Sequence, residues 1–269
     1  MKQNEVRRTA TLLTLIRERK PLIHHITNMV TMNDSANMTL AIGALPVMAH
    51  AIEEVEEMVS LAGALVLNIG TPDPNRIEAM VRAGKRANVR RIPIVLDPVG
   101  VGATRFRTQS ALRLLQELRI TVIRGNAAEM AALIGVAAEI RGVESLSVAD
   151  DSESLARRVA RALGCVAAIT GAYDYISDGE RVGRVENGHP LLASITGSGC
   201  MSTSLVAAFL SVEQDAYFAA IAALIMMGLA GELAALKANG PGTFHAHLFD
   251  AVAAMDEATL MQKQKVSIF

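Results

Sequence analysis

The chain has 269 residues, of which 51% are hydrophobic, and its formal net charge is −1. This composition supports a large buried core, and we expect a single domain over residues 1–269 because no Pro- or Ser-rich linker divides the chain. The balanced charge, without a long basic tract, argues against nucleic acid as a partner. The two cysteines show neither C-x-x-C nor zinc-ligand spacing, which indicates a reduced, cytoplasmic protein.

Neither end of the chain nor its apolar stretches predict a membrane partner. The first 20 residues mix charges with leucines and lack the apolar core of a signal peptide. The stretch 216–231 lies between Asp215 and Glu232 and is rich in alanine. A membrane helix needs about 20 mostly apolar residues. A helix buried on several sides explains this stretch better.

Short apolar runs alternate with helical patterns up to residue 170. Most of the runs are continuous rather than alternating, which predicts parallel strands covered on both faces and joined by right-handed crossovers. The expected strands are Leu22–Ile26, Leu45–Met48, Leu65–Ile69, Ile94–Asp97, Thr121–Arg124 and Val166–Thr170. The expected helices are Met32–Gly43, Glu53–Ala62, Asn75–Asn88, Gln109–Leu118, Ala127–Leu133 and Ser152–Leu163.

The pattern changes after Thr170. Turn signals at 177–179 and 187–188 separate further short strands, which predicts an antiparallel edge on the sheet. These strands are Asp174–Ile176, Arg181–Val185 and Leu191–Ala193, and helices are expected from Gly197 to the end. The fold class is therefore α/β, with a mostly parallel central sheet flanked by helices.

Polar residues follow several of the expected parallel strands. They are Thr27-Asn28, Asn68, Asp97-Pro98, Arg124-Gly125-Asn126 and Thr170-Gly171. Each alone is more simply explained as a turn. Because ligands of open parallel sheets bind at the carboxyl ends of the strands, their joint placement favours a binding site.

The segment Thr196-Gly197-Ser198-Gly199-Cys200 follows an expected strand and opens an apolar helix. Glycines let the backbone fold closely around a ligand, and the N–H groups of a helix start bind anions such as a phosphoryl group. The segment is not a Walker A loop, because Gly-Lys-Ser/Thr is missing, nor a dinucleotide fingerprint. A plain glycine-rich helix cap is an equally good interpretation.

Cys200 lies in the first turn of this helix. The helix dipole is expected to lower the pKa of its thiol from about 8.5. If the segment binds an anion, Cys200 lies where a substrate hydroxyl would approach; the alternative is a small buried residue. Cys165, just before an apolar strand, is expected in the core.

Asp97 and Glu129 are the carboxylates of interest. Asp97 ends a strand, and Glu129 comes three residues after Asn126, which can cap the following helix. Glu129 either completes a capping box or bonds to magnesium-bound water, and the sequence favours neither. Arg124 could contact phosphate oxygens.

An ordered set of segments covers nearly the whole chain: Pro21–Asn28, Gly43–Met48, Leu67–Thr71, Asp97–Thr104, Ile123–Glu129, Ile169–Gly171, Thr196–Cys200 and Gly240–Phe244. Each is weak alone, but together they resemble the hydroxyethylthiazole kinases of thiamine salvage, in the ribokinase-like superfamily. The resemblance implies a ribokinase-like three-layer fold. It also implies ATP- and Mg²⁺-dependent phosphorylation of the hydroxyl of 4-methyl-5-(2-hydroxyethyl)thiazole, giving its phosphate and ADP.

The resemblance also implies roles for individual residues. Substrate positions are Met48, Gly197, Asn28 and Asn68; nucleotide positions are Arg124, Thr170 and Asn126; acidic positions near magnesium, acting through water, are Asp97 and Glu129. The Gly197-Ser198-Gly199 backbone would hold the transferring group, and Cys200 would orient the hydroxyl; whether it also accepts the proton stays open from the sequence. Because the family is typically trimeric, a homotrimer with the thiazole site between subunits is expected.

Two other functions remain open from the sequence. One is another kinase of the superfamily, acting on hydroxymethylpyrimidine or a sugar; related kinases usually carry aspartate in place of Cys200, so Cys200 and Met48 argue against it. The other is a non-catalytic regulator that binds nucleotide or thiazole. The retained Asp97, Glu129 and Cys200 argue against that function.

Overall fold

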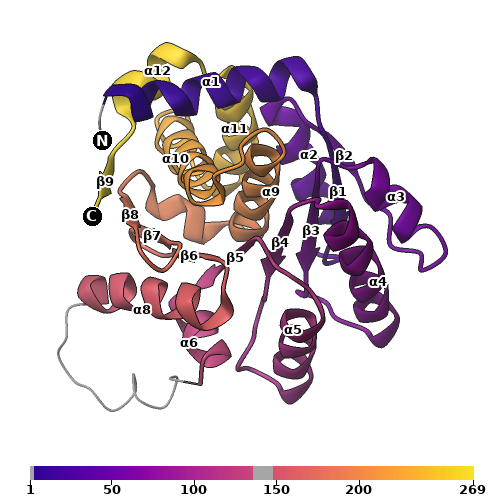
Figure 1. Cartoon of the computed structure of the whole chain (residues 1–269). Helices are drawn as coiled ribbons and strands as arrows, with labels where there is room; N and C mark the ends of the chain where they lie inside the picture. Colours follow the sequence, from indigo (N-terminus) through magenta and orange to yellow (C-terminus); the bar gives the residue numbers. More distant parts are fainter. Residues whose placement is uncertain (1–2, 136–147) are drawn as a thin grey trace.

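The computed structural model describes residues 3–135 and 148–269, and a nine-stranded sheet runs through this part of the chain in the order β2-β1-β3-β4-β5-β6-β7-β8-β9 (Figure 1). Strands β1 to β6 are parallel, and β7 to β9 add antiparallel partners at one edge. The strands are β1 Leu22–Ile26, β2 Leu45–Val47, β3 Ala64–Asn68, β4 Ile94–Asp97, β5 Val122–Asn126, β6 Val166–Thr170, β7 Asp174–Ser177, β8 Val182–Val185 and β9 Val266–Ile268. The predicted sheet, mostly parallel with an antiparallel edge, is confirmed.

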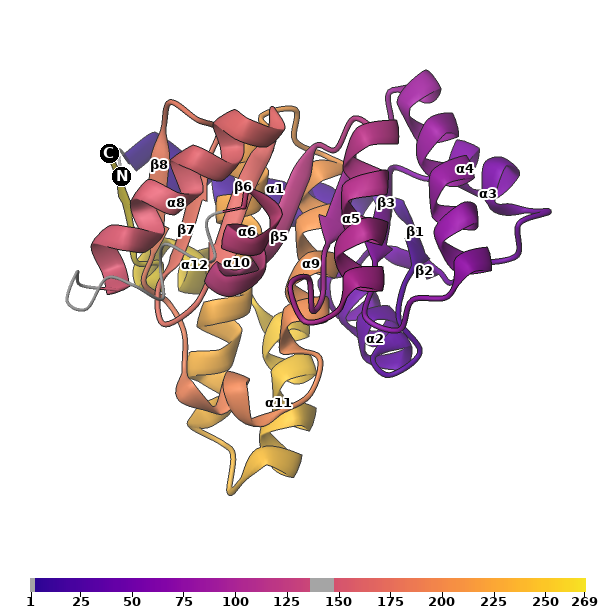
Figure 2. The same ribbon diagram turned by 90° about the horizontal axis from the view of Figure 1, so that it is seen from below.

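Helices cover both faces of the sheet. The helices are α1 Gln3–Arg19, α2 Met32–Ile42, α3 Val55–Leu61, α4 Pro74–Arg90, α5 Arg105–Glu117, α6 Ala127–Leu133, α8 Val148–Leu163, α9 Ser198–Leu210, α10 Ala216–Ala235, α11 Pro241–Ala254 and α12 Glu257–Lys263. Along β3, Ala64 and Val66 pack into one apolar core with α1, α2 and α9–α12, whereas Leu65 and Leu67 pack into a second core with α3–α6 and α8. Figure 1 shows these two sets of helices on opposite sides of the strands, and Figure 2 shows α8, α6, α5 and α4 in front of them. Burial on both faces explains the continuous apolar strands.

Helix α10 is the apolar stretch for which the sequence predicts a buried helix. By length and composition it could cross a membrane, and it alone could do so in the part of the chain that the structure describes, but 83% of its apolar window is buried inside the protein. It packs between α9 and α11. The prediction of a core helix is confirmed.

Two predictions for the last third of the chain are wrong. Leu191–Ala193 is not a strand; it lies in a 3₁₀ helix, Pro190–Ser194, in which His189 Nδ1 accepts from Leu191 N. Proline is favoured at a helix start because its backbone torsion is already set. The third antiparallel strand is instead β9, in a region expected to be helical, and three residues are too short to show a pattern.

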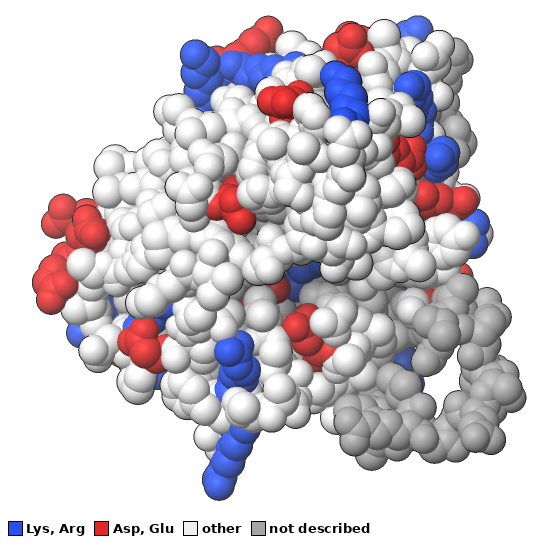
Figure 3. All heavy atoms as spheres, turned by 180° about the vertical axis from the view of Figure 1, so that it is seen from behind, with Lys and Arg blue, Asp and Glu red and all other residues white. Residues whose placement is uncertain are grey.

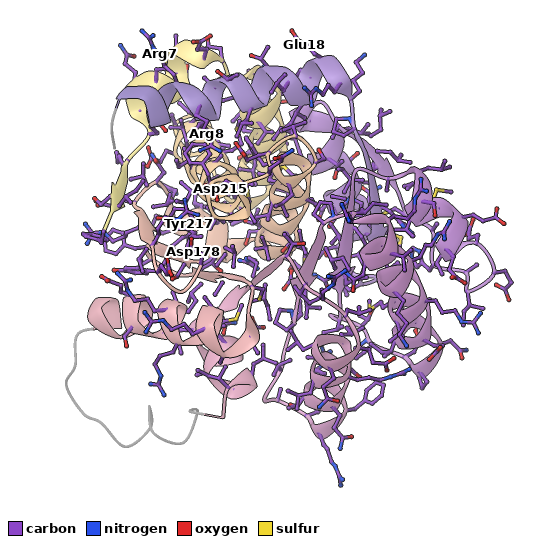
Figure 4. The ribbon with its side chains drawn as sticks, viewed as in Figure 1. Arg7, Arg8, Glu18, Asp178, Asp215 and Tyr217 are labelled. Carbon is purple, nitrogen blue, oxygen red and sulfur yellow. The ribbon has the colours of Figure 1, made fainter. Side chains whose placement is uncertain are left out.

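An arginine ties the antiparallel edge to α10, at the end of the sheet opposite the carboxyl ends of the parallel strands. Arg181 pairs with Asp178 at 2.7 Å and with Asp215 at 2.9 Å, and its guanidinium lies 4.3 Å from the centre of the Tyr217 ring. Figure 4 shows Asp215, Tyr217 and Asp178 one below another on this side. These half-exposed pairs contribute modestly to stability, since water screens them.

Candidate active site

The carboxyl ends of the parallel strands bring most of the predicted residues to one edge of the sheet. Asn68 lies opposite Asp97 in the β3–β4 pairing, and Asn126 lies opposite Thr170 in the β5–β6 pairing. Asn28 follows the end of β1 closely. The common edge that the sequence predicts is therefore present.

Asp97 is buried at this edge, with an exposed fraction of 1%. Its Oδ2 atom accepts hydrogen bonds from Asn68 Nδ2 at 2.8 Å and from Thr203 Oγ1 at 2.9 Å. Arg124 Nη1 lies 3.9 Å from the same oxygen. Burial raises the pKa of Asp97 to about 6, although the charge of Arg124 opposes this.

Cys200 belongs to the same hydrogen-bond network. Its Sγ accepts from Asn68 Nδ2 at 3.2 Å and from Asn28 Nδ2 at 3.4 Å, and Asn28 Nδ2 also donates to Asn68 Oδ1 at 2.9 Å. Burial, followed by the negative charge of Asp97, raises the pKa of Cys200. The predicted lowering by the helix dipole is therefore wrong, because loss of solvent around the thiolate and a nearby carboxylate outweigh the dipole.

The glycines at the start of α9 make room for protein side chains. Gly197 has a φ of +88°, and a Cβ there would lie 2.7 Å from Thr31 Cγ2. A Cβ on Gly199 would overlap Nη1 of Arg124. The sequence assigned these glycines to close approach of a ligand, but their direct neighbours here are Thr31 and Arg124.

The N-terminus of α9 has no side-chain cap within the described chain. Its first N–H groups have no partner inside the helix. The first two helical positions, Ser198 and Gly199, both line the neighbouring cavity. The arrangement suits an anion, which is one of the two interpretations that the sequence leaves open.

A cavity of about 590 Å³ opens beside this helix end. Its lining includes the polar side chains of Arg124, Thr170, Asp174 and Ser198 and apolar groups such as Leu192 and Met227. Its size and mixed lining fit a nucleotide. Cys165, the other cysteine, is only partly exposed and packs against the second core, and burial raises the pKa of its thiol to about 12.

Arg124 is one of the side chains that line the cavity. Its Nη2 donates to Thr170 Oγ1 at 2.6 Å. Its Nε is buried and has no hydrogen-bond partner among the described residues. A buried donor without a partner is unfavourable, and an anionic ligand would satisfy it.

Asp174 was missed as a site residue by the sequence analysis, which noted it only as the start of a strand. Its Oδ1 accepts from Gly171 N at 3.1 Å, and burial raises the pKa of its carboxyl to about 7. It lines the cavity near Thr170. Aspartate at a strand start is common in turns, so the sequence carried no signal for this position.

Glu129 forms the capping box that the sequence left open. Glu129 N donates to Asn126 Oδ1 and Glu129 Oε2 accepts from Asn126 N, both at 2.9 Å, while Glu129 Oε1 accepts from Gly100 N at 2.8 Å. Arg107, also missed, donates to Val99 O at 2.8 Å and to Gly70 O at 2.6 Å. These contacts fix the loops after β3 and β4 around the site.

The described residues contain no group of three or more His, Cys, Asp or Glu side chains placed to hold a metal ion. A carboxylate oxygen can accept more than one hydrogen bond, so Asp97 and Glu129 could still accept from metal-bound water. This is the mode that magnesium favours, because it keeps several waters.

Met48 lies apart from this network. It follows β2, the outermost parallel strand, is half-buried, and is not part of the cavity lining.

The mostly parallel sheet, covered by helices on both faces and extended by an antiparallel edge, defines a ribokinase-like fold. A ribokinase-like superfamily protein from Enterococcus faecalis superposes with a TM-score of 0.65 at 12% identity, covering 96% of each chain. Pyridoxal kinase from Staphylococcus aureus in complex with ADP gives a TM-score of 0.58 at 16% identity, over 78% of this chain and 87% of that one. At these identities the likeness concerns the fold alone.

Closer relatives define the family. Residues 13–258 match the hydroxyethylthiazole kinase family. The chain is 56% identical to hydroxyethylthiazole kinase of Roseiflexus sp. over 91% of each chain, and 52% identical to that of Thermoanaerobacter pseudethanolicus over 95% of this chain and 97% of the relative. The hydroxyethylthiazole kinase structure from Pyrococcus horikoshii superposes with a TM-score of 0.90 at 44% identity, covering 97% of this chain and 98% of that one. The chain belongs to the hydroxyethylthiazole kinase family.

Proposed function

We propose that the protein transfers the terminal phosphoryl group of ATP to the hydroxyl of 4-methyl-5-(2-hydroxyethyl)thiazole, in thiamine salvage. Family membership supports the reaction. The structural observation that carries the proposal is the uncapped start of α9, which lies between a nucleotide-sized cavity and Cys200. A phosphoryl group at this helix end could be passed between ligands on either side.

The nucleotide occupies the cavity. Arg124 and Thr170 bind phosphate oxygens, and the unpaired Nε of Arg124 supports this role. Asn126 acts at the same site by fixing the start of α6. The N–H groups around Gly197, Ser198 and Gly199 hold the transferring phosphoryl group, because the loose transition state of phosphoryl transfer is stabilised mainly by positioning and charge.

Cys200 orients the acceptor hydroxyl. Its raised pKa keeps the thiol protonated at neutral pH, so it is a weak base. Asn28 and Asn68 act on the substrate through this sulfur, since their amide hydrogens point to Cys200 and Asp97. Gly197 and Met48 complete the thiazole site.

Magnesium is the second requirement of the proposed reaction. Asp97 and Glu129 would hold it through water, and the ion would neutralise charge on the phosphates. Asp97 is buried beside Arg124, and burial disfavours its charge unless a cation is near. Glu129 keeps the loop after β4 at this edge.

We further propose that the protein is a cytoplasmic homotrimer whose thiazole site lies between subunits. Large apolar side chains are exposed along one stretch of chain on and around α2: Met29 and Val30 at 67%, Leu40 at 52% and Leu45 at 45%. This stretch includes the edge strand β2, which Met48 follows. The face in Figure 3 carries few charged side chains across its centre. Such surfaces mark interfaces between proteins.

A coupled assay of ADP release, with and without the thiazole alcohol, tests this function. We expect release that depends on both the thiazole and Mg²⁺. Hydroxymethylpyrimidine and ribose serve as competing acceptors, and a higher kcat/KM for either would contradict the assignment of substrate. Nucleotide or thiazole binding without turnover would instead indicate a regulator.

A further inference from the structure

Thr203 contacts the buried carboxylate of Asp97 from the interior of α9. Its side chain is completely buried, and its hydroxyl lies 2.9 Å from Asp97 Oδ2 and 3.2 Å from Gly199 O. A hydroxyl has one hydrogen to donate, and a bond to a charged acceptor is the stronger of two choices. The shorter contact therefore joins α9 to the end of β4.

Asn68 holds the same oxygen from the other side. Its Nδ2 donates to Asp97 Oδ2 at 2.8 Å and to Cys200 Sγ at 3.2 Å. The Asn68 side chain is itself fixed, because its Oδ1 accepts from Gly70 N and from Asn28 Nδ2, both at 2.9 Å. Two donors thus converge on Oδ2, and neither engages Oδ1.

We propose that Thr203 is a positioning residue for phosphoryl transfer. With Asn68, it fixes the rotation of the Asp97 carboxylate so that Oδ1 is presented to the phosphates and their counter-ion. This inference rests on the proposed role of Asp97, whereas Thr203 is assigned here from its contacts alone.

Because Thr203 lies on α9, its contact with Asp97 also affects the geometry of the proposed phosphoryl site. The N-terminus of α9 holds the proposed phosphoryl site and Cys200, and Thr203 lies one turn further along the same helix. The contact therefore sets the distance between the phosphoryl site and the carboxylate. A displacement of about 1 Å near the reacting atoms can lower the rate about 100-fold.

Ser204 provides a matched control. It is the next residue, is also completely buried, and donates to Cys200 O at 3.1 Å, one turn back in the helix. Thr203 makes the equivalent contact with Gly199 O. Both hydroxyls therefore lie within reach of a carbonyl one turn back, and of the two only Thr203 reaches Asp97.

The experiment compares Thr203→Val, Thr203→Ser and Ser204→Ala with the wild type. For Thr203→Val we expect kcat to fall about 10- to 100-fold, with KM for ATP and for the thiazole within about twofold, because valine keeps the shape but donates no hydrogen bond. Thr203→Ser is expected to restore kcat to within about threefold, and Ser204→Ala to stay within about twofold of the wild type.

A crystal structure of each unliganded protein gives a readout that does not depend on activity. The Asp97 carboxylate is expected to rotate in Thr203→Val and to keep its orientation in Thr203→Ser. An unchanged orientation in Thr203→Val would overturn the inference, as would a kcat loss that Ser204→Ala shares. If the wild type shows no turnover, the proposed function fails, and the orientation of Asp97 still decides the role of Thr203.

Discussion

Cys200 is placed as a hydrogen-bond acceptor, with two asparagine amides donating to its sulfur. We expect Cys200→Ala to lower kcat about tenfold and to keep measurable activity, because a weak base contributes less than the 10²–10⁴-fold of an effective one. Steady-state kinetics checks this. Cys165→Ala is the matched control and should retain wild-type kcat, since Cys165 lies before β6, at its opposite end from Thr170. Wild-type turnover in Cys200→Ala would remove Cys200 from the mechanism.

The buried carboxylate of Asp97 lowers the stability of the folded protein when it is ionised. Its pKa rises from 3.8 to about 6 on folding, so the folded state disfavours the ionised carboxylate. The penalty is complete above about pH 6 and disappears as the pH falls toward 3.8, where the unfolded chain also binds the proton. Asp97→Asn should therefore raise the free energy of unfolding by ~1–3 kcal/mol at pH 8, while abolishing activity.

Denaturant unfolding at pH 8 and pH 5 checks this prediction. The advantage of Asp97→Asn should shrink at the lower pH, because the wild-type carboxyl then binds a proton in the folded state. Asp250→Asn, at a side chain that is 73% exposed, serves as the control and should change stability little. A loss of stability at pH 8 in Asp97→Asn would contradict the argument.

Individual roles were harder to predict from the sequence than the positions of the residues. The pattern placed Asn68, Asp97 and Thr170 at strand ends, and the structure brings them to one edge. The pKa of Cys200 was predicted in the wrong direction, because its burial depends on strands distant in sequence. The sequence did not identify Thr203 as a site residue, since a threonine inside an apolar helix cannot be distinguished by pattern from other core positions.

Helix α9 packs its first turn directly against a side chain from β5, at Gly199 and Arg124. Gly199→Ala should displace the guanidinium and raise KM for ATP about tenfold or more, because Arg124 would lose its place beside Thr170. Gly242→Ala is the matched control: it is also the second residue of a helix, and nothing lies within 4 Å of a Cβ there. Titration with a fluorescent ATP analogue measures the affinities, and equal affinities in the two variants would contradict this packing argument.

The sequence predicted elements best where both sides of the element are buried. Strands β3, β4 and β6 are apolar up to their last residue, and their prediction needed no tertiary information. Arg105–Thr108 was missed at the start of α5, because the cap is Thr104, whose Oγ1 accepts from Arg107 N at 3.3 Å. Strand β9 was missed because its three residues become a strand only by pairing with β8, which lies some 80 residues earlier.

The exposed apolar stretch on and around α2 bears on how the whole molecule assembles. A monomer rarely leaves several large apolar side chains exposed together unless they bind something. Segment 29–45 runs from the loop beside Asn28 to the edge strand β2. An unpaired edge strand is itself prone to associate with another chain. Assembly through this surface would bring the end of β2, which Met48 follows, toward a second subunit.

Leu40→Asp tests that assembly. Leu40 is 52% exposed on α2, and a charge there would have to be buried without a partner if the surface forms an interface. We expect the native mass to fall from trimer to monomer and KM for the thiazole to rise about tenfold, while ATP affinity changes little. Val89→Asp is the matched control, because Val89 is 75% exposed on α4, and it should keep the wild-type mass and kinetics. Light scattering gives the mass; a Leu40→Asp protein with the same mass and thiazole KM as the wild type would show that the thiazole site is complete within one chain.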